Sequence, residues 1–91
     1  MKRVPKYIFA EKAEVSPRTL GSWLKDNESD LLKLGQRKEH KQLNYKAVIY
    51  LCLLQAIDVK EVYPDVTKEE ISETYIQINA LLDGKISRYI V

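Results

Sequence analysis

The chain has 91 residues, 45% of them hydrophobic, which is enough for one small domain with its own core. The single cysteine, Cys52, excludes an intrachain disulfide framework, and the apolar run from Ala47 to Ile57 is too short to span a membrane. The net charge of +2 is unevenly distributed: residues 1–50 carry 11 Lys and Arg against 6 Asp and Glu, whereas residues 51–91 carry 4 against 7. Such a basic half is typical of a nucleic-acid-binding face, although a solvated basic surface has the same charge balance.

The N-terminal segment predicts a short helix followed by a turn. The helix begins at Pro5 or Lys6 and directs three apolar residues at helical spacing toward the core: Ile8, Phe9 and Ala13. It ends at a turn around Glu14 and Val15. Charges interrupt the apolar residues of this segment, which argues against a signal peptide and predicts a cytoplasmic protein.

A second helix is predicted from Pro17 to Asp26. Ser16 is a favourable N-cap, and Pro17 suits the first helical position because the amide proton that proline lacks would have no intrahelical acceptor. The buried stripe of this helix consists of Leu20, Trp23 and Leu24.

The next segment, "NESDLLKLGQRKEHKQLNY", is more polar. We expect Ser29 to cap one short helical turn through Leu34, with Gly35 ending it. The stretch "QRKEHKQL" has no helical stripe, so it forms a short hairpin or an extended loop.

Two further helices are predicted in the C-terminal half. Asn44 caps an apolar helix from Tyr45 to about Ile57, which is buried and contains Cys52 as a core residue, and Pro64 interrupts the connector that follows.

The last helix has the clearest local signal. Thr67 and Glu70 fit a capping box, Val66 can pack on Ile71, and the helix runs to about Asp83 before Gly84. One face of it is apolar: Ile71, Tyr75, Ile78 and Leu82. Residues 85–91 form either a short strand or a tail.

The pattern of residues does not indicate an enzyme. The three glycines are scattered, so they form no phosphate-binding loop, and His40 lies in a charged stretch without a neighbouring nucleophile. Acidic clusters fall at predicted helix starts, where they favour the helix dipole. We therefore expect neither a catalytic residue, nor a metal site, nor a cofactor.

The segment "AEVSPRTLGSW" combines a turn, a cap and a helix in the order that a DNA-binding helix-turn-helix requires. The second helix turns polar residues outward, where Arg, Thr and Ser side chains can reach bases or phosphates. Lys and Arg residues of the following loop can neutralise phosphates. The candidate DNA-binding residues are Ser16, Arg18, Thr19, Ser22, Lys25, Arg37, Lys38 and Lys41. Lys2, Arg3 and Lys6 can form a flexible basic arm.

"FAEKAEVSPRTLGSWL" resembles the helix-turn-helix segment of MerR-type regulators and of small excisionase-like proteins, and it is also similar to short bacterial domains of this type. Ala10 matches the small residue at the helix crossing, Val15 the apolar turn position and Leu20 the buried recognition-helix position. The stretch "RKEHKQLNYKAVIYLCLLQAI" looks like the wing and the helix that follow. The resemblance, over about residues 7–57, implies that Arg18, Thr19 and Ser22 face bases or backbone, and that Arg37, Lys38 and Lys41 contact phosphates.

Two positions depart from the family pattern. Glu14 stands where a glycine with positive φ is frequent, at a cost of roughly 1 kcal/mol. Gly21 stands where a basic or polar residue is frequent on the exposed face; it removes a contact, or else it permits close approach to a backbone or to another helix.

These observations predict a mostly α fold: one helix-turn-helix domain over residues 1–91, with a short wing-like hairpin or loop and two further helices. Residues 1–43 form the basic helix-turn-helix and wing, and residues 44–91 form helical support and a candidate dimerisation region. The predicted function is sequence-specific binding of double-stranded DNA by a transcriptional regulator or a recombination accessory factor. The alternative is a protein-interaction or homodimerisation module without DNA binding, with its interface at Ile71, Tyr75, Ile78 and Leu82.

Overall fold

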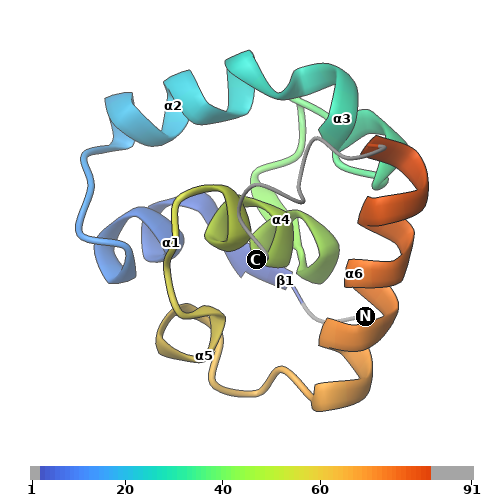
Figure 1. The fold of residues 1–91 in the computed structure, drawn as a ribbon. Helices are drawn as coiled ribbons and strands as arrows, with labels where there is room; N and C mark the ends of the chain where they lie inside the picture. The colour runs from blue at the N-terminus through green and yellow to red at the C-terminus, as the bar shows by residue number, and fades with distance from the viewer. Residues whose placement is uncertain (1–2, 83–91) are drawn as a thin grey trace.

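The computed structural model describes residues 3–82, with side chains through Ala80, and it is mostly helical, as predicted (Figure 1). Within residues 3–82 there are six helices and two short strands. In chain order they are β1 (Arg3–Pro5), α1 (Lys6–Lys12), α2 (Pro17–Asp26), α3 (Glu28–Lys33), β2 (Gln42–Asn44), α4 (Tyr45–Leu54), α5 (Val59–Val62) and α6 (Lys68–Leu82). α2 and α3 lie along one edge of the fold, α6 along another, and α4 occupies the centre (Figure 1).

α4 is the core helix of the domain. Its residues Ala47–Cys52 are each no more than 1% exposed, as expected for a helix that is apolar on every side and surrounded by other elements. The Asn44 side chain caps it by accepting the Ala47 N–H at 2.8 Å. The predicted cap and the burial of Cys52 are therefore confirmed.

α4 ends earlier than the sequence predicts. It stops at Leu54 and not at about Ile57, because Ala56 adopts a left-handed conformation with φ of 55°. The Ile57 N–H then bonds the Cys52 carbonyl at 2.8 Å, which closes the helix end in a Schellman motif.

The same motif closes α1 and α3. Glu14 has φ of 59°, and the following Val15 N–H bonds the Ala10 carbonyl at 2.9 Å; the predicted positive φ at Glu14 is confirmed. Gly35 has φ of 84° and ends α3 as predicted, a conformation that glycine adopts without steric cost.

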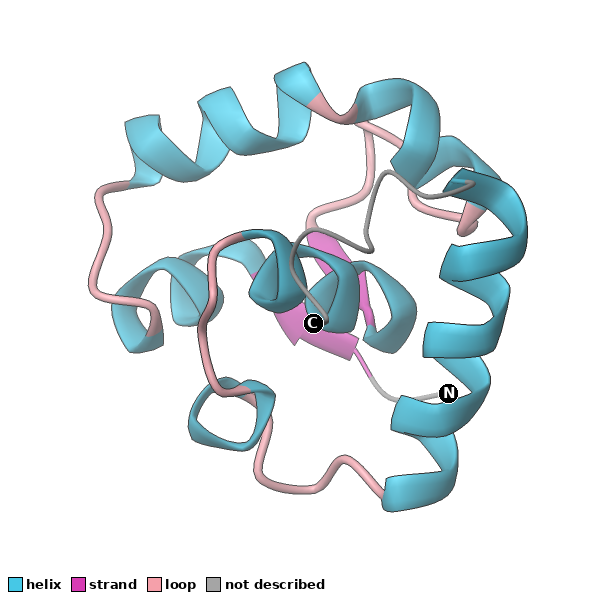
Figure 2. Cartoon of the chain, viewed as in Figure 1, coloured by secondary structure: helices cyan, strands magenta, loops and turns pink. Residues whose placement is uncertain are grey.

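β1 and β2 pair antiparallel, with Val4 opposite Leu43, and bring the N-terminal segment beside the residues that precede α4 (Figure 2). The prediction of a flexible basic arm is therefore wrong for Arg3, which lies in β1, and for Lys6, which begins α1. Lys2 lies outside the described residues. Of the two alternatives predicted for "QRKEHKQL", the loop is found: residues 36–41 are a loop, and the strand after it pairs with β1.

The predicted cap at Ser29 is wrong. Ser29 does not cap α3, because that helix begins at Glu28 and Ser29 lies inside its first turn. The connector before Pro64 contains a short helix that the sequence did not indicate, α5, whose cap, Asp58, accepts the Lys60 N–H at 3.0 Å.

α6 begins with the predicted capping box. The Thr67 hydroxyl accepts the Glu70 N–H at 3.1 Å, and the Glu70 carboxylate accepts the Thr67 N–H at 2.9 Å. The predicted end at Asp83 and Gly84, and the strand or tail over residues 85–91, lie outside the described residues. In residues 3–82 no helix combines the length and the apolar character that a membrane span requires.

Candidate nucleic-acid interface

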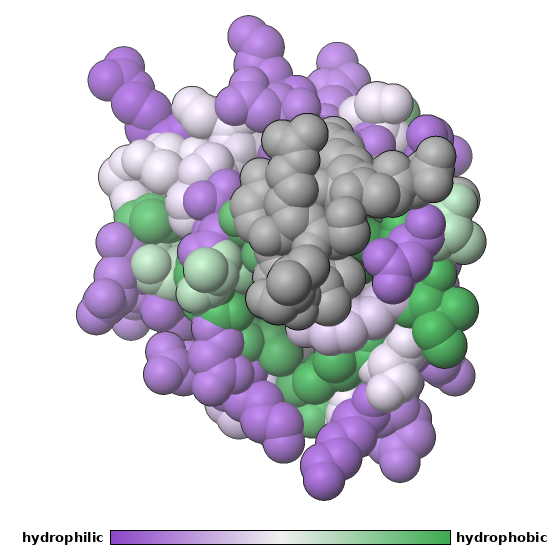
Figure 3. Space-filling view, in the orientation of Figure 1, coloured by the Kyte–Doolittle hydropathy of each residue, from purple (hydrophilic) through white to green (hydrophobic). Residues whose placement is uncertain are grey.

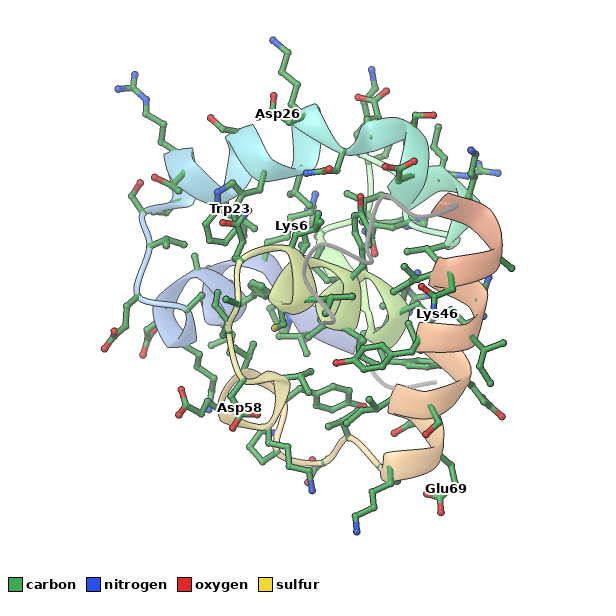
Figure 4. The ribbon with its side chains drawn as sticks, viewed as in Figure 1. Lys6, Trp23, Asp26, Lys46, Asp58 and Glu69 are labelled. Atoms are coloured by element: carbon green, nitrogen blue, oxygen red, sulfur yellow. The ribbon has the colours of Figure 1, made fainter. Side chains whose placement is uncertain are left out.

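The turn between α1 and α2 places the two helices against each other. Ser16 accepts the Thr19 N–H through its hydroxyl oxygen at 3.1 Å, and Pro17 occupies the first helical position, so the predicted start of α2 is confirmed. Leu20 is 2% exposed, and Trp23 and Leu24 pack partly buried against the same core. Figure 4 shows Trp23 directed inward from α2, whereas Asp26 points outward.

The opposite face of α2 is open. Arg18, Ser22 and Lys25 are all exposed, and their spacing of four and three residues places them on one side of the helix. In the view of Figure 3, hydrophilic side chains project along the edge formed by α2 and α3. The structure thus brings together three of the candidate residues on the surface farthest from the buried stripe.

Two other candidates, Ser16 and Thr19 at the start of α2, use part of their hydrogen-bonding capacity in the helix cap. The Ser16 hydroxyl donates to Thr19 Oγ1 at 3.1 Å, and the Thr19 side chain is half-buried. Pro17 has no N–H, and that of Thr19 bonds Ser16. The first turn of α2 therefore offers a phosphate fewer donors than the sequence indicates.

A buried tyrosine fixes the far end of α2. The Tyr50 side chain is 0% exposed, and its hydroxyl lies 2.9 Å from Asp30 Oδ2 and 3.2 Å from Asn27 Oδ1. Asn27 in turn donates to the Trp23 carbonyl at 2.9 Å. These bonds connect the core helix α4 to the junction of α2 and α3, so that the orientation of α2 depends on the core.

The basic loop over residues 36–41 is held at its base by a buried glutamine. Gln36 is 3% exposed; its Oε1 accepts the Asn44 N–H at 2.8 Å, and its Nε2 donates to the Gln42 carbonyl at 3.1 Å. The Asn44 side chain also donates to the Leu34 carbonyl at 3.2 Å. The loop is consequently closed by hydrogen bonds across its two ends.

Lys6 ties this loop to the start of α1. Its N–H bonds the Lys41 carbonyl at 3.2 Å, and its Nζ donates to the Lys38 carbonyl at 3.3 Å. Within the loop, the His40 N–H bonds the Arg37 carbonyl at 3.1 Å, and His40 Nδ1 accepts the Arg37 N–H at 3.3 Å. The Arg37, Lys38 and Lys41 side chains are exposed on a backbone that these bonds hold in place.

Two hollows separate α2 from the loop. One has a volume of about 390 Å³ and the other about 510 Å³, and both are lined by Lys6, Gly21, Leu24 and Lys38. Figure 4 shows Lys6 beneath α2, between that helix and α4. We call the two hollows together the α2–loop groove. Its charged lining residues are Lys6, Lys25, Glu28, Arg37, Lys38, Glu39 and Lys41.

The α2–loop groove therefore gathers four predicted site residues: Lys25, Arg37, Lys38 and Lys41. Five lysine or arginine side chains against two glutamates give the charged residues of its lining a net positive charge. Arg18 and Ser22 do not line it, but they share the exposed face of α2 with Lys25.

The face of α6 that the sequence suggested for dimerisation packs within the chain. Ile78 is 0% exposed, and Ile71 and Tyr75 are partly buried against the core. The side chain of Leu82 lies outside the described part. Among the α6 side chains that the structure describes, the exposed large apolar one is Ile76, at 71%. An α6 interface made through Ile78 is therefore incompatible with the packing of the single chain.

No group of three or more His, Cys, Asp or Glu side chains suited to a metal is found in the described range 3–82. Burial, with a further contribution from the Asp58 carboxylate, raises the pKa of the Cys52 thiol to about 12, so this cysteine is protonated at neutral pH and is a poor nucleophile.

Sequence reasoning missed three residues that hold α2 and the basic loop in place: Lys6, Gln36 and Tyr50. Lys6 was assigned to a flexible arm, and the other two carried no assignment. A glutamine between a helix-ending glycine and a basic run is the available signal for Gln36, because such a residue can close a loop through both of its amide atoms.

Comparison with known proteins gives no match: no family model, no curated protein and no solved structure is significantly similar to this chain.

Proposed function

We propose that this protein binds double-stranded DNA, with α2 in the major groove and the loop over residues 36–41 on the phosphates. The carrying observation is the α2–loop groove, where a capped helix with an exposed polar face stands beside a hydrogen-bonded basic loop. A helix presented in this way fits the major groove, and the adjacent cations neutralise phosphates. The class proposed is a MerR-like or excisionase-like winged helix-turn-helix protein, acting in transcription or in recombination.

The roles of the residues follow from their positions. Arg18 and Ser22 face away from the core and reach base edges, since arginine can bond guanine in a bidentate manner. Lys25 on α2, and Lys38 and Lys41 on the loop, supply sequence-independent attraction. Lys6 and Gln36 hold the loop at a fixed distance from α2, which reduces the entropy lost on binding.

Substitutions separate these roles. Lys38→Ala lowers affinity for all duplexes alike and reduces the slope of log affinity against log salt by about 0.9. Arg18→Ala relaxes discrimination at one base position, at a cost of about 1–3 kcal/mol for the preferred base.

The matched control is Lys60→Ala, which removes the same charge from the exposed surface of α5, outside the α2–loop groove. Fluorescence anisotropy with labelled duplexes over a salt series gives both the affinity for each duplex sequence and the slope of log affinity against log salt. If neither Arg18→Ala nor Lys38→Ala differs from Lys60→Ala at low salt, the proposed function is wrong.

A further inference from the structure

Gly21 is placed where glycine has no role inside the chain. It lies in the interior of α2 and is exposed, and a Cβ added to it would meet no atom within 4 Å. Its φ is not in the left-handed region, in contrast to that of Gly35. Neither packing nor backbone conformation therefore requires glycine here, although glycine inside a helix is about 1 kcal/mol less favourable than alanine.

The surroundings of Gly21 indicate what approaches it. The residue lines both hollows of the α2–loop groove, so a bare stretch of helix backbone faces the open space between α2 and the loop. Lysine side chains border the same space: Lys6 and Lys38 line both hollows, and Lys25 lines the first. Their charge is complementary to an anionic chain, whereas a neutral or basic protein segment would leave the cations uncompensated.

Lys6 has donors available for such a chain. An ammonium group carries three N–H donors, and the bond to the Lys38 carbonyl occupies one of them. That bond also holds the half-buried Lys6 side chain in the groove. The ammonium charge of Lys6 is therefore already in position before an anion binds.

We propose that the sugar-phosphate backbone of one DNA strand passes over Gly21, with its phosphates bound by Lys6, Lys25 and Lys38. The inference rests on the proposed function and deepens it, since it names the part of the nucleic acid that occupies the groove. The missing side chain at Gly21 allows a closer approach to α2 than any other residue would permit.

The test uses two variants of the full chain, Gly21→Ala and Gly21→Gln. Both residues are better helix formers than glycine, and neither side chain meets an intramolecular obstacle at Cβ, so both variants are expected to unfold at higher urea concentration than the wild type. Ser72→Gln, at an exposed position on α6, is the matched control for a glutamine introduced into a helix.

We expect the Gly21 variants to lose affinity for DNA while they remain folded. Gly21→Gln weakens binding to duplex DNA about tenfold or more, because its side chain keeps the phosphates away from the three lysines, and Gly21→Ala weakens it less. The loss is the same for every duplex sequence, because phosphate contacts carry no sequence information. Ser72→Gln binds as the wild type does.

The outcomes distinguish the two proposals. If the wild type binds duplexes and Gly21→Gln binds them with unchanged affinity, the passage of DNA over Gly21 is refuted while the proposed function stands. If Gly21→Ala is less stable than the wild type, glycine serves the fold and the inference is also refuted. If the wild type binds no duplex, the proposed function itself fails.

Discussion

The hydrogen bonds of Gln36 give the most direct test of how the basic loop is held. Gln36→Met keeps the length and volume of the side chain but removes the acceptor for the Asn44 N–H and the donor to the Gln42 carbonyl. An unsatisfied buried main-chain group costs about 1–3 kcal/mol. The Asn44 bond is buried and the Gln42 bond only partly so, which gives an expected loss of about 2–4 kcal/mol for the two together.

This loss is a large fraction of the stability of a domain of this size, about 5–14 kcal/mol. In urea, with a slope of about 2 kcal/mol/M, the unfolding midpoint falls by about 1–2 M. The α-helical circular dichroism signal, followed over a urea titration, measures the shift of the unfolding midpoint. Gln42→Met makes the same chemical exchange at an exposed side chain of β2 and changes stability by less than about 0.5 kcal/mol.

The reasoning would be refuted if Gln36→Met and Gln42→Met unfolded at the same urea concentration. That result would mean that the loop is closed without the glutamine and that the bonds at 2.8 and 3.1 Å contribute nothing net to folding.

Three further predictions concern single residues. Tyr50→Phe removes the hydroxyl that bonds Asp30 and destabilises the fold by about 1–2 kcal/mol in urea titrations, and an unchanged midpoint would contradict the role given to that bond. Glu14→Gly relieves the left-handed φ of 59° and raises stability by about 0.5–1 kcal/mol, whereas Glu11→Gly, inside α1, lowers it; the same sign for both would contradict the assignment. Cys52 reacts with a thiol reagent at pH 8 far more slowly in the folded chain than in urea, since burial raises its folded pKa from 9.0 to about 12. The stability that this shift contributes is complete below pH 9 and is lost between pH 9 and 12, and fast native-state labelling would refute the burial.

The parts of the fold that follow from short-range chemistry could be predicted from the sequence. The caps at Ser16, Asn44 and Thr67 each bond an N–H three residues away, so the residues concerned lie close together in the chain. The buried stripe of α2 and the apolar α4 likewise follow from periodicity and composition.

The ends of helices were harder to predict where the residue type does not favour the conformation. Ala56 ends α4 in a left-handed conformation that alanine rarely adopts, so the sequence predicted continuation to Ile57. Asn27 begins α3 without a side-chain cap, because its Oδ1, the atom that would accept a helix N–H, accepts the Tyr50 hydroxyl instead. The sequence placed the cap at Ser29, which gave a wrong start.

The loop and its attachment depend on contacts that no local pattern encodes. β1 pairs with β2 across some forty residues of sequence, and Lys6 bonds the carbonyls of Lys38 and Lys41 over a similar separation. The loop-closure entropy of such long-range pairings must be offset by burial of the core. Periodicity and propensity cannot indicate them, and for this reason the sequence predicts a flexible basic arm at Lys2, Arg3 and Lys6.

Selection from a pool of random duplex DNA tests the central claim most directly. The purified protein is taken through several rounds of binding and amplification, and the affinity of the enriched duplexes is then measured from low to physiological salt. The account predicts a defined motif, with affinity that falls steeply as salt rises because several phosphates are neutralised by the α2–loop groove. Sequences that remain random after selection, with only weak binding at low salt, would contradict it.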